Sequence, residues 1–283
     1  MQVAVIGLGA MGRRIAGRLA RTGHSVSVWS RRSTVDVPGV RVGSSPADAA
    51  CGADVVITMV SDGAALRAVV PGADGLAAGL GDGATVVQMS TVDSAAAQWL
   101  SRNLPAGAGL LDVPVLGSIA EAEAGTLVLL TGGDDEVVAA CEPVLRVLGT
   151  QHRVGGLGAG TAAKLVANNA LFGVIGVLGE CLALAESFGL SADAAFEILD
   201  RTPLQAQARR RRPAITDDQY PPRFALDTAL KDAGLIAASA REAGIDARLS
   251  AAMATWLSDA SDKGFGGLDY TAVLAYIRHR RPR

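Results

Sequence analysis

Few of the 283 residues are of the kinds that build metal sites or hydrolytic centres. The three cysteines, at positions 51, 141 and 181, are far apart and lack metal-ligand spacing, and their scarcity is typical of a reducing compartment. None of the three histidines stands among acidic residues or cysteines with metal spacing, and none completes a Ser-His-Asp triad. We therefore expect no metal ion and no triad-based hydrolysis.

The chain also lacks an excess of charge and a segment suited to a membrane. With 26 basic and 28 acidic residues the formal net charge is −2, which predicts neither nucleic-acid nor membrane binding and favours a small-molecule ligand. The most apolar stretch, residues 170–185, contains Glu180 and is shorter than the roughly 20 residues that cross a bilayer. We interpret it as a buried helix. Because the first strand is expected at Gln2, we also expect a cytoplasmic protein.

Aromatic residues are scarce at 4%, whereas 49% of the chain is hydrophobic. The core must therefore be built mainly from Ala, Val, Leu and Ile, with 34 glycines available for turns and close packing. This composition is typical of α/β proteins. The length exceeds that of a typical single domain and favours two domains.

The first half of the sequence alternates short apolar runs with helical segments. Strand candidates lie at residues 3–6, 25–29, 55–59, 85–89, 109–112, 127–131 and 152–154. Strands that alternate with helices predict a parallel sheet covered on both faces. We therefore expect an α/β fold whose residues 1–158 form an N-terminal Rossmann-type, doubly wound domain.

Beyond Gly160 the strand pattern disappears and helical patterns follow one another. A long helix is expected at residues 161–188, and shorter ones at about 192–200, 227–243, 250–263 and 270–278. We expect residues 159–283 to form an all-α C-terminal domain, joined to the first by the long interdomain helix. This domain is expected to contribute to substrate binding and to oligomerisation.

A glycine-rich turn follows the first predicted strand and opens an amphipathic helix. In a GxGxxG turn, the first glycine permits the tight turn, the second lets a pyrophosphate approach the backbone, and the third lets helix and strand pack closely. The helix N-terminus then faces the anion. The residues expected to bind a dinucleotide in this way are Gly7, Leu8, Gly9, Ala10, Met11 and Gly12.

The end of the second strand indicates which dinucleotide is bound. An acidic residue at this point would accept a hydrogen bond from the ribose of NAD, but the chain has Ser30, Arg31 and Arg32. Two guanidinium groups and a hydroxyl can pair with a 2′-phosphate, which an acidic residue would repel. The sequence therefore favours NADP (NADPH) over NAD.

A second polar motif begins the long helix. Lys164 and Asn168 are four residues apart, so an amine and an amide share one helical face. Such a pair suits proton transfer beside a nicotinamide. Together with the glycine turn, the pair predicts a hydride-transfer enzyme.

An ordered set of motifs extends this pattern over nearly the whole chain. The set comprises residues 7–12, Met89-Ser-Thr-Val-Asp93, Asp112-Val-Pro-Val-Leu-Gly-Ser118, Gly125-Thr-Leu127, the Lys164 helix, Tyr220-Pro-Pro-Arg-Phe224, Lys231-Asp232 and Gly267-Leu-Asp-Tyr-Thr-Ala-Val273. In these motifs the sequence resembles the β-hydroxyacid dehydrogenase family, and most closely its glyoxylate/succinic semialdehyde reductase branch.

The resemblance implies roles for individual residues. Lys164 corresponds to the family's catalytic lysine, a general acid in reduction and a general base in oxidation, and Asn168 to its partner near the reacting oxygen. The implied cofactor contacts are Met59, Val60, Thr91 and Lys231, and the implied substrate contacts are Ser90, Gly117 and Ser118. Asp232 is expected to be structural. The implied substrate is a small carboxylate-bearing aldehyde, keto acid or hydroxy acid, and we expect a homo-oligomer, a dimer or tetramer.

Two residues depart from the family pattern beside the implied substrate loop. Leu116 stands where the family commonly has Ser, and Glu121 replaces a residue that is frequently small. Leucine removes a hydrogen-bond donor and adds apolar bulk. The preferred substrate is therefore expected to differ in size or polarity from glyoxylate or succinic semialdehyde.

Two alternatives remain open at this stage. Imine reductases resemble this architecture and share the Gly-His…Val-Trp-Ser-Arg pattern around the second strand, at residues 23–31. They usually lack a lysine at the position of Lys164. A catalytically silent dinucleotide-binding scaffold is the other alternative. Loss of Lys164 or of the glycine turn would mark such a scaffold, and both are present.

Overall fold

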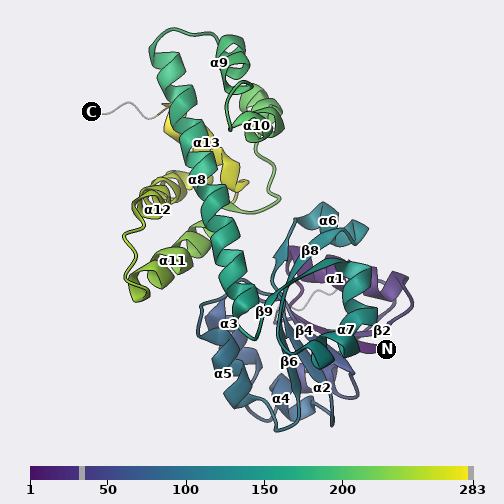
Figure 1. The fold of residues 1–283 in the computed structure, drawn as a ribbon. Helices are drawn as coiled ribbons and strands as arrows, with labels where there is room; N and C mark the ends of the chain where they lie inside the picture. Colours follow the sequence, from purple (N-terminus) through teal and green to yellow (C-terminus); the bar gives the residue numbers. More distant parts are fainter. Residues whose placement is uncertain (32–35, 280–283) are drawn as a thin grey trace. The chain divides into compact units, whose positions relative to one another are not determined.

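The computed structural model describes residues 1–31 and 36–279 (Figure 1). The chain divides into two compact units, Met1–Lys164 and Leu165–Arg283. Each unit has hydrophobic clusters of its own. The predicted domain boundary between residues 158 and 159 stays a prediction.

Unit 1 is built on a nine-stranded sheet. The strands are β1 (Gln2–Ile6), β2 (Ser25–Trp29), β3 (Val40–Val42), β4 (Val55–Thr58), β5 (Thr85–Gln88), β6 (Gly109–Asp112), β7 (Val115–Leu116), β8 (Leu127–Gly132) and β9 (Gly149–Gly155). Their order is β3-β2-β1-β4-β5-β6-β8-β7, with β9 paired to β8. The first six strands pair in parallel, in the order typical of dinucleotide-binding folds.

The helices of unit 1 cover both faces of this sheet, as the alternating sequence predicts (Figure 1). They are α1 (Ala10–Arg21), α2 (Pro46–Ala50), α3 (Gly63–Val69), α4 (Leu76–Gly79), α5 (Ala96–Asn103), α6 (Ile119–Ala124) and α7 (Asp135–Leu148). In β1, Val3 and Val5 belong to the cluster that contains residues of α1 and α7, whereas Ala4 and Ile6 belong to the cluster with α3 and α5. Successive residues of a strand point to opposite faces, so a continuous apolar run suits a strand buried on both sides.

Beyond β6 the sheet is not all parallel, although the sequence had predicted it to be. Strand β8 pairs antiparallel with β6 and β7, and parallel with β9. The two-residue strand β7 and the strand β3 were not among the predicted strands, because segments of two or three residues are too short to show a period. The α/β, doubly wound fold class itself is confirmed.

Unit 2 is helical, as predicted. The long helix α8 (Ala159–Ser187) begins in unit 1 and continues into unit 2. The other helices are α9 (Ala192–Leu199), α10 (Gln205–Asp217), α11 (Leu226–Glu242), α12 (Arg248–Ala260), the short turns η1 (Ser261–Phe265) and η2 (Tyr270–Ala272), and α13 (Val273–His279). The bounds of helix α10 were not predicted, because its arginine-rich sequence has no clear apolar stripe.

Helix α8 is apolar over most of its length. Among the described residues it is the one helix whose length and composition would let it cross a membrane, and 39% of its most apolar window is buried. Phe172, Ile175 and Leu178 are part of the core of unit 2, whereas Leu184 and Phe188 are exposed. The expected buried helix is therefore buried along one side only.

Candidate functional site

The carboxyl ends of the parallel strands carry most of the predicted site residues of unit 1. Strands β1, β4, β5 and β6 are parallel neighbours, so the residues that follow them lie at one edge of the sheet. The strand order reverses at β1, and open α/β sheets bind ligands at such a switch point. This edge is the candidate functional site of unit 1.

The three glycines of the turn after β1 serve three different needs. Gly7 has a φ of +104°, and a Cβ there would clash with the carbonyl oxygen of Met59. A Cβ on Gly12 would clash with the carbonyl oxygen of Gly7. A Cβ on Gly9, by contrast, would meet no atom within 4 Å. The protein's own packing therefore does not require a glycine at this position. A phosphate fits this combination of a fixed turn and an open cradle.

Helix α1 begins directly after this cradle with its backbone donors exposed to it. Gly9 is the N-cap, no side chain caps the helix, and its first turn contains no acidic residue. The first N–H groups of a helix lack intrahelical partners and favour an anion. The turn residues therefore fit the pyrophosphate of a dinucleotide.

The end of β2 is tied to the same turn. The N–H of Gly7 donates to the carbonyl oxygen of Trp29 at 2.9 Å, so Ser30 and Arg31 follow immediately beside the cradle. Ser30 is half-buried and Arg31 is exposed. Arg32 lies outside the described residues.

A buried hydrogen-bond network joins the ends of β4 and β5. The Ser90 hydroxyl accepts from the N–H of Val60 at 2.9 Å and donates to the carbonyl oxygen of Thr58 at 3.3 Å. The Gln88 side chain donates to the carbonyl oxygen of Ser90 at 2.8 Å. Ser90 is only 1% exposed, so its hydroxyl orders the loops that carry Met59, Val60 and Thr91. Its predicted contact with substrate stays a prediction.

The loop before α6 is organised by Glu121. The Ser118 N–H donates to Glu121 Oε2 at 2.8 Å, and the Ser118 hydroxyl accepts from the backbone N–H at Glu121, which forms a capping box. The backbone N–H of Ser118, an expected substrate contact, thus already donates to a carboxylate of the chain. The roles of Gly117 and Ser118 in substrate binding stay predictions.

Lys164 belongs to unit 1, where it lies in the second turn of α8. That helix is held at the carboxyl end of β6 through Asp112, which bonds to Thr161. Lys164 is half-buried. Lys164 therefore belongs to a helix whose first turn is bound at the same edge of the sheet as the glycine turn.

In unit 2 the structure adds a carboxylate to the predicted amide. Asn168 is 2% exposed, and its Nδ2 donates to Asp232 Oδ2 at 2.8 Å. Lys231 Nζ lies 2.9 Å from Asp232 Oδ1, so Asp232 contacts two predicted site residues. From the sequence, Asp232 was expected only to be structural. The one sequence feature that could have indicated a role for Asp232 at the site is its position directly after Lys231, a predicted cofactor contact.

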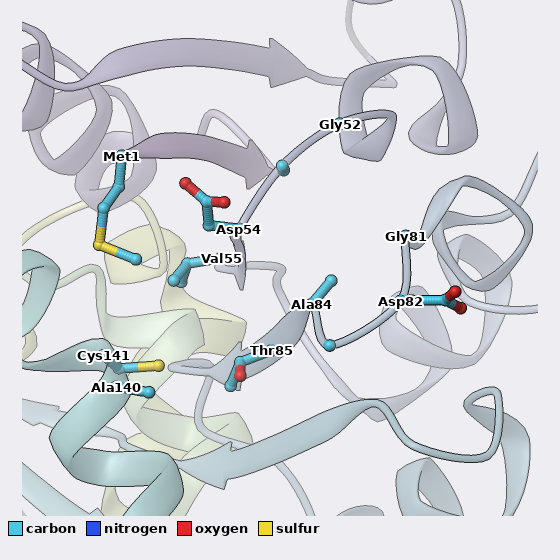
Figure 2. Close-up of a pocket in the computed structure, with 12 residues that line it drawn as sticks. Met1, Gly52, Asp54, Val55, Gly81, Asp82, Ala84, Thr85, Ala140 and Cys141 are labelled. Atoms are coloured by element: carbon cyan, nitrogen blue, oxygen red, sulfur yellow. The ribbon is translucent and has the colours of Figure 1, made fainter.

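A cavity of about 280 Å³ lies elsewhere in unit 1 (Figure 2). It is lined by residues before and at the starts of β4 and β5, among them Asp54 and Asp82, and by Cys141 of α7. Burial raises the pKa of the Cys141 thiol to about 11. No predicted site residue lines this cavity, which is at the amino ends of the strands. In the part of the chain that the structure describes, no group of His, Cys, Asp and Glu could hold a metal ion.

The sheet order and the glycine turn define a dinucleotide-binding protein of the Rossmann type. A family model described as the NAD binding domain of 6-phosphogluconate dehydrogenase matches residues 2–158. A second, described as "NAD-binding of NADP-dependent 3-hydroxyisobutyrate dehydrogenase", matches residues 158–277. The chain belongs to the β-hydroxyacid dehydrogenase family, whose members are NAD(P)-dependent hydroxyacid dehydrogenases and reductases.

Individual relatives match along nearly their whole length. The chain is 35% identical to an L-threonate dehydrogenase of Cupriavidus necator, covering 96% of this chain and 94% of that protein. It is 31% identical to glyoxylate/succinic semialdehyde reductase 1 of Arabidopsis thaliana, covering 99% and 100%. A solved structure of 3-hydroxyisobutyrate dehydrogenase of Mycobacterium tuberculosis is 29% identical, with a TM-score of 0.88 over 98% of this chain and 99% of that one.

Proposed function

We propose that the protein uses NADPH to reduce a small aldehyde or keto acid to the corresponding hydroxy acid, with Lys164 as the general acid. The observation that supports this best is the location of Lys164 in unit 1, in the helix anchored at the strand edge that also carries the glycine turn. When bound, the cofactor supplies a hydride. Lys164 then donates a proton to the substrate oxygen, and in the reverse direction its neutral amine accepts it.

Asn168 is proposed to orient the reacting oxygen. Its amide is fixed by the hydrogen bond to Asp232, which leaves the side chain little freedom to rotate. Lys231, half-buried and paired with the same carboxylate, is proposed as a cofactor contact. A preorganised amide lowers the barrier without any reorganisation at the moment of reaction.

The preference for NADPH is supported by the end of β2. Ser30 and Arg31 follow the strand directly, and no acidic residue stands there to repel a 2′-phosphate. Arg32 is proposed as a further contact from the sequence. Met59, Val60 and Thr91, at the ends of β4 and β5, are proposed to contact the cofactor.

The substrate end of the site is proposed to include Ser90, Gly117 and Ser118. The relatives named for threonate, glyoxylate and succinic semialdehyde suggest substrates of this size. A homo-oligomer through unit 2 is also proposed, supported by the exposed side chains of Leu184 and Phe188. A cytoplasmic location is proposed from the scarcity of cysteine.

Replacement of Lys164 tests this function. Lys164→Ala is expected to lower kcat for reduction of glyoxylate or succinic semialdehyde by about 10²- to 10⁴-fold, the usual contribution of a general acid. The dissociation constant for NADPH should stay within about twofold, because the glycine turn is intact. Steady-state kinetics with NADPH and NADH, and a titration of NADPH binding, measure both quantities.

The exposed Lys263 provides a matched control, and Lys263→Ala should retain wild-type kcat. Wild-type turnover in Lys164→Ala would overturn the role of Lys164. Tight NADPH binding without turnover of any aldehyde or keto acid would instead favour a silent scaffold. Turnover of a cyclic imine alone would favour imine reduction.

A further inference from the structure

A buried carboxylate that the proposed chemistry does not use anchors the start of α8. Asp112 is the last residue of β6 and is 1% exposed. The N–H of Thr161 donates to its Oδ2 at 2.6 Å, and the Thr161 hydroxyl donates to its Oδ1 at 2.9 Å. Each carboxylate oxygen of Asp112 therefore receives a bond from a residue 49 positions away.

The backbone at this point is packed as tightly as the side chains. A Cβ on Gly160 would clash with the carbonyl oxygens of Asp112, the last residue of β6, and of Leu130, within β8. A Cβ on Gly132 would lie 2.8 Å from the N of Gly160. The first turn of α8 therefore packs closely against the backbone of β6 and β8.

Burying a carboxylate at a helix end costs desolvation free energy. Thr161 N–H is among the first donors of α8, which have no partner within the helix. Burial raises the pKa of Asp112, and the hydrogen bonds from Thr161 act in the opposite direction. The strength of charge-assisted hydrogen bonds offsets this cost and holds the turn in one position.

We propose that Asp112 is a positioning residue that, through Thr161, fixes the helical turn bearing Lys164. Thr161 and Lys164 are three residues apart and thus neighbours on the helix surface. The inference rests on the proposed role of Lys164. A reacting group displaced by about 1 Å can lose a factor of about 10² in rate, so the anchor controls turnover without touching substrate.

The side chain of Thr161 offers the cleanest test. Thr161→Val keeps the shape and the backbone bond but removes the hydroxyl donor, and is expected to lower kcat about tenfold. The KM for NADPH should stay within about twofold, because the glycine turn follows a different strand. Thr161→Ser restores the donor and should retain kcat within about twofold of wild type. Asp112→Ala, which removes both acceptors, should lower kcat further.

A double mutant separates positioning from a general structural effect. In a Lys164→Ala background, Thr161→Val should lower residual kcat by less than about twofold, because the amine that it positions is gone. An equal tenfold loss in both backgrounds would overturn the proposal, as would an unchanged kcat in Thr161→Val or a KM for NADPH that rises tenfold. If Asp112→Ala fails to fold, the Thr161 variants decide the question. Failure of the proposed function can be told apart from failure of this proposal, because it appears as wild-type turnover in Lys164→Ala.

Discussion

Glu121 accepts a hydrogen bond from Ser118, a residue that we expect to contact the substrate. Its carboxylate accepts from the Ser118 N–H at 2.8 Å. If Ser118 contacts substrate as proposed, a substrate carboxylate at that donor meets a negative charge nearby. Like charges a few ångströms apart repel by several kcal/mol at the low effective dielectric of a protein surface. Leu116 is half-buried in the same loop, and we predict that the charge of Glu121 weakens the binding of an anionic substrate there.

Glu121→Gln is expected to raise kcat/KM for succinic semialdehyde about tenfold, because it removes the charge. Glutamine also satisfies a capping box, so the loop keeps its structure. The methyl ester of succinic semialdehyde is the neutral comparison and should change by less than about twofold. Steady-state kinetics on both compounds, with wild type as control, measure the ratio. An equal change for acid and ester would show that charge at Glu121 does not select the substrate.

The glycine turn and helix α1 act as one element. Gly7 and Gly12 are needed for the protein's own packing, because a Cβ at either position would clash with backbone atoms. Gly9 is different, since a Cβ there would meet open space. The same motif therefore contains residues needed for folding and a residue needed only when a ligand is bound.

Two alanine variants separate these needs. Gly9→Ala should leave the midpoint of thermal unfolding within about 2 °C of wild type but weaken NADPH binding at least tenfold, because the methyl group enters the phosphate cradle. Gly12→Ala should lower the unfolding midpoint by several degrees, since small-to-large changes in tight packing typically cost about 1–3 kcal/mol. Differential scanning calorimetry and a fluorescence titration of NADPH measure the two effects. Tight NADPH binding by a folded Gly9→Ala would contradict this assignment of the cradle.

At the scale of the whole molecule, unit 2 leaves large apolar side chains in solvent. Leu184 on α8 and Phe188, directly after the end of α8, are 55% and 73% exposed, and Ile198 on α9 is 53% exposed. The N–H of Phe188 donates to the carbonyl oxygen of Leu184 at 3.1 Å, so the two residues lie one turn apart on the same side of the chain. Apolar side chains gathered on one face are typical of an interface between copies of a chain.

The double variant Leu184→Glu/Phe188→Glu is expected to convert a homo-oligomer into a monomer, because charges are unfavourable in an apolar interface. Size-exclusion chromatography with light scattering should give a multiple of the single-chain mass for wild type and the single-chain mass for the variant. Ile245→Glu, at another exposed apolar residue of unit 2, is the control and should not change the mass. A monomeric wild type would contradict the proposed oligomer.

Elements that are encoded by patterns of neighbouring residues were predicted well from the sequence. The turn at residues 7–12 and the strands β1, β2, β4, β5 and β6 were predicted within a residue or two, because apolar runs and glycine spacing are properties of neighbouring residues. The short strands β3 and β7 were missed, and the bounds of the arginine-rich helix α10 were not predicted. In α10, Arg209 pairs with Asp200 and Arg212 with Asp193, contacts that no local pattern indicates.

The sequence by itself determined the fold class, the dinucleotide turn and the family, because each depends on residue types at fixed short spacing. The tertiary structure decided which side chains hold the predicted site residues. Asp112 meets Thr161 across 49 residues, and Asn168 meets Asp232 across 64, only because the sheet and the helices bring those segments together. The reason is physical: a buried polar group must find a partner, and the fold, not the distance along the chain, determines which partner is within reach.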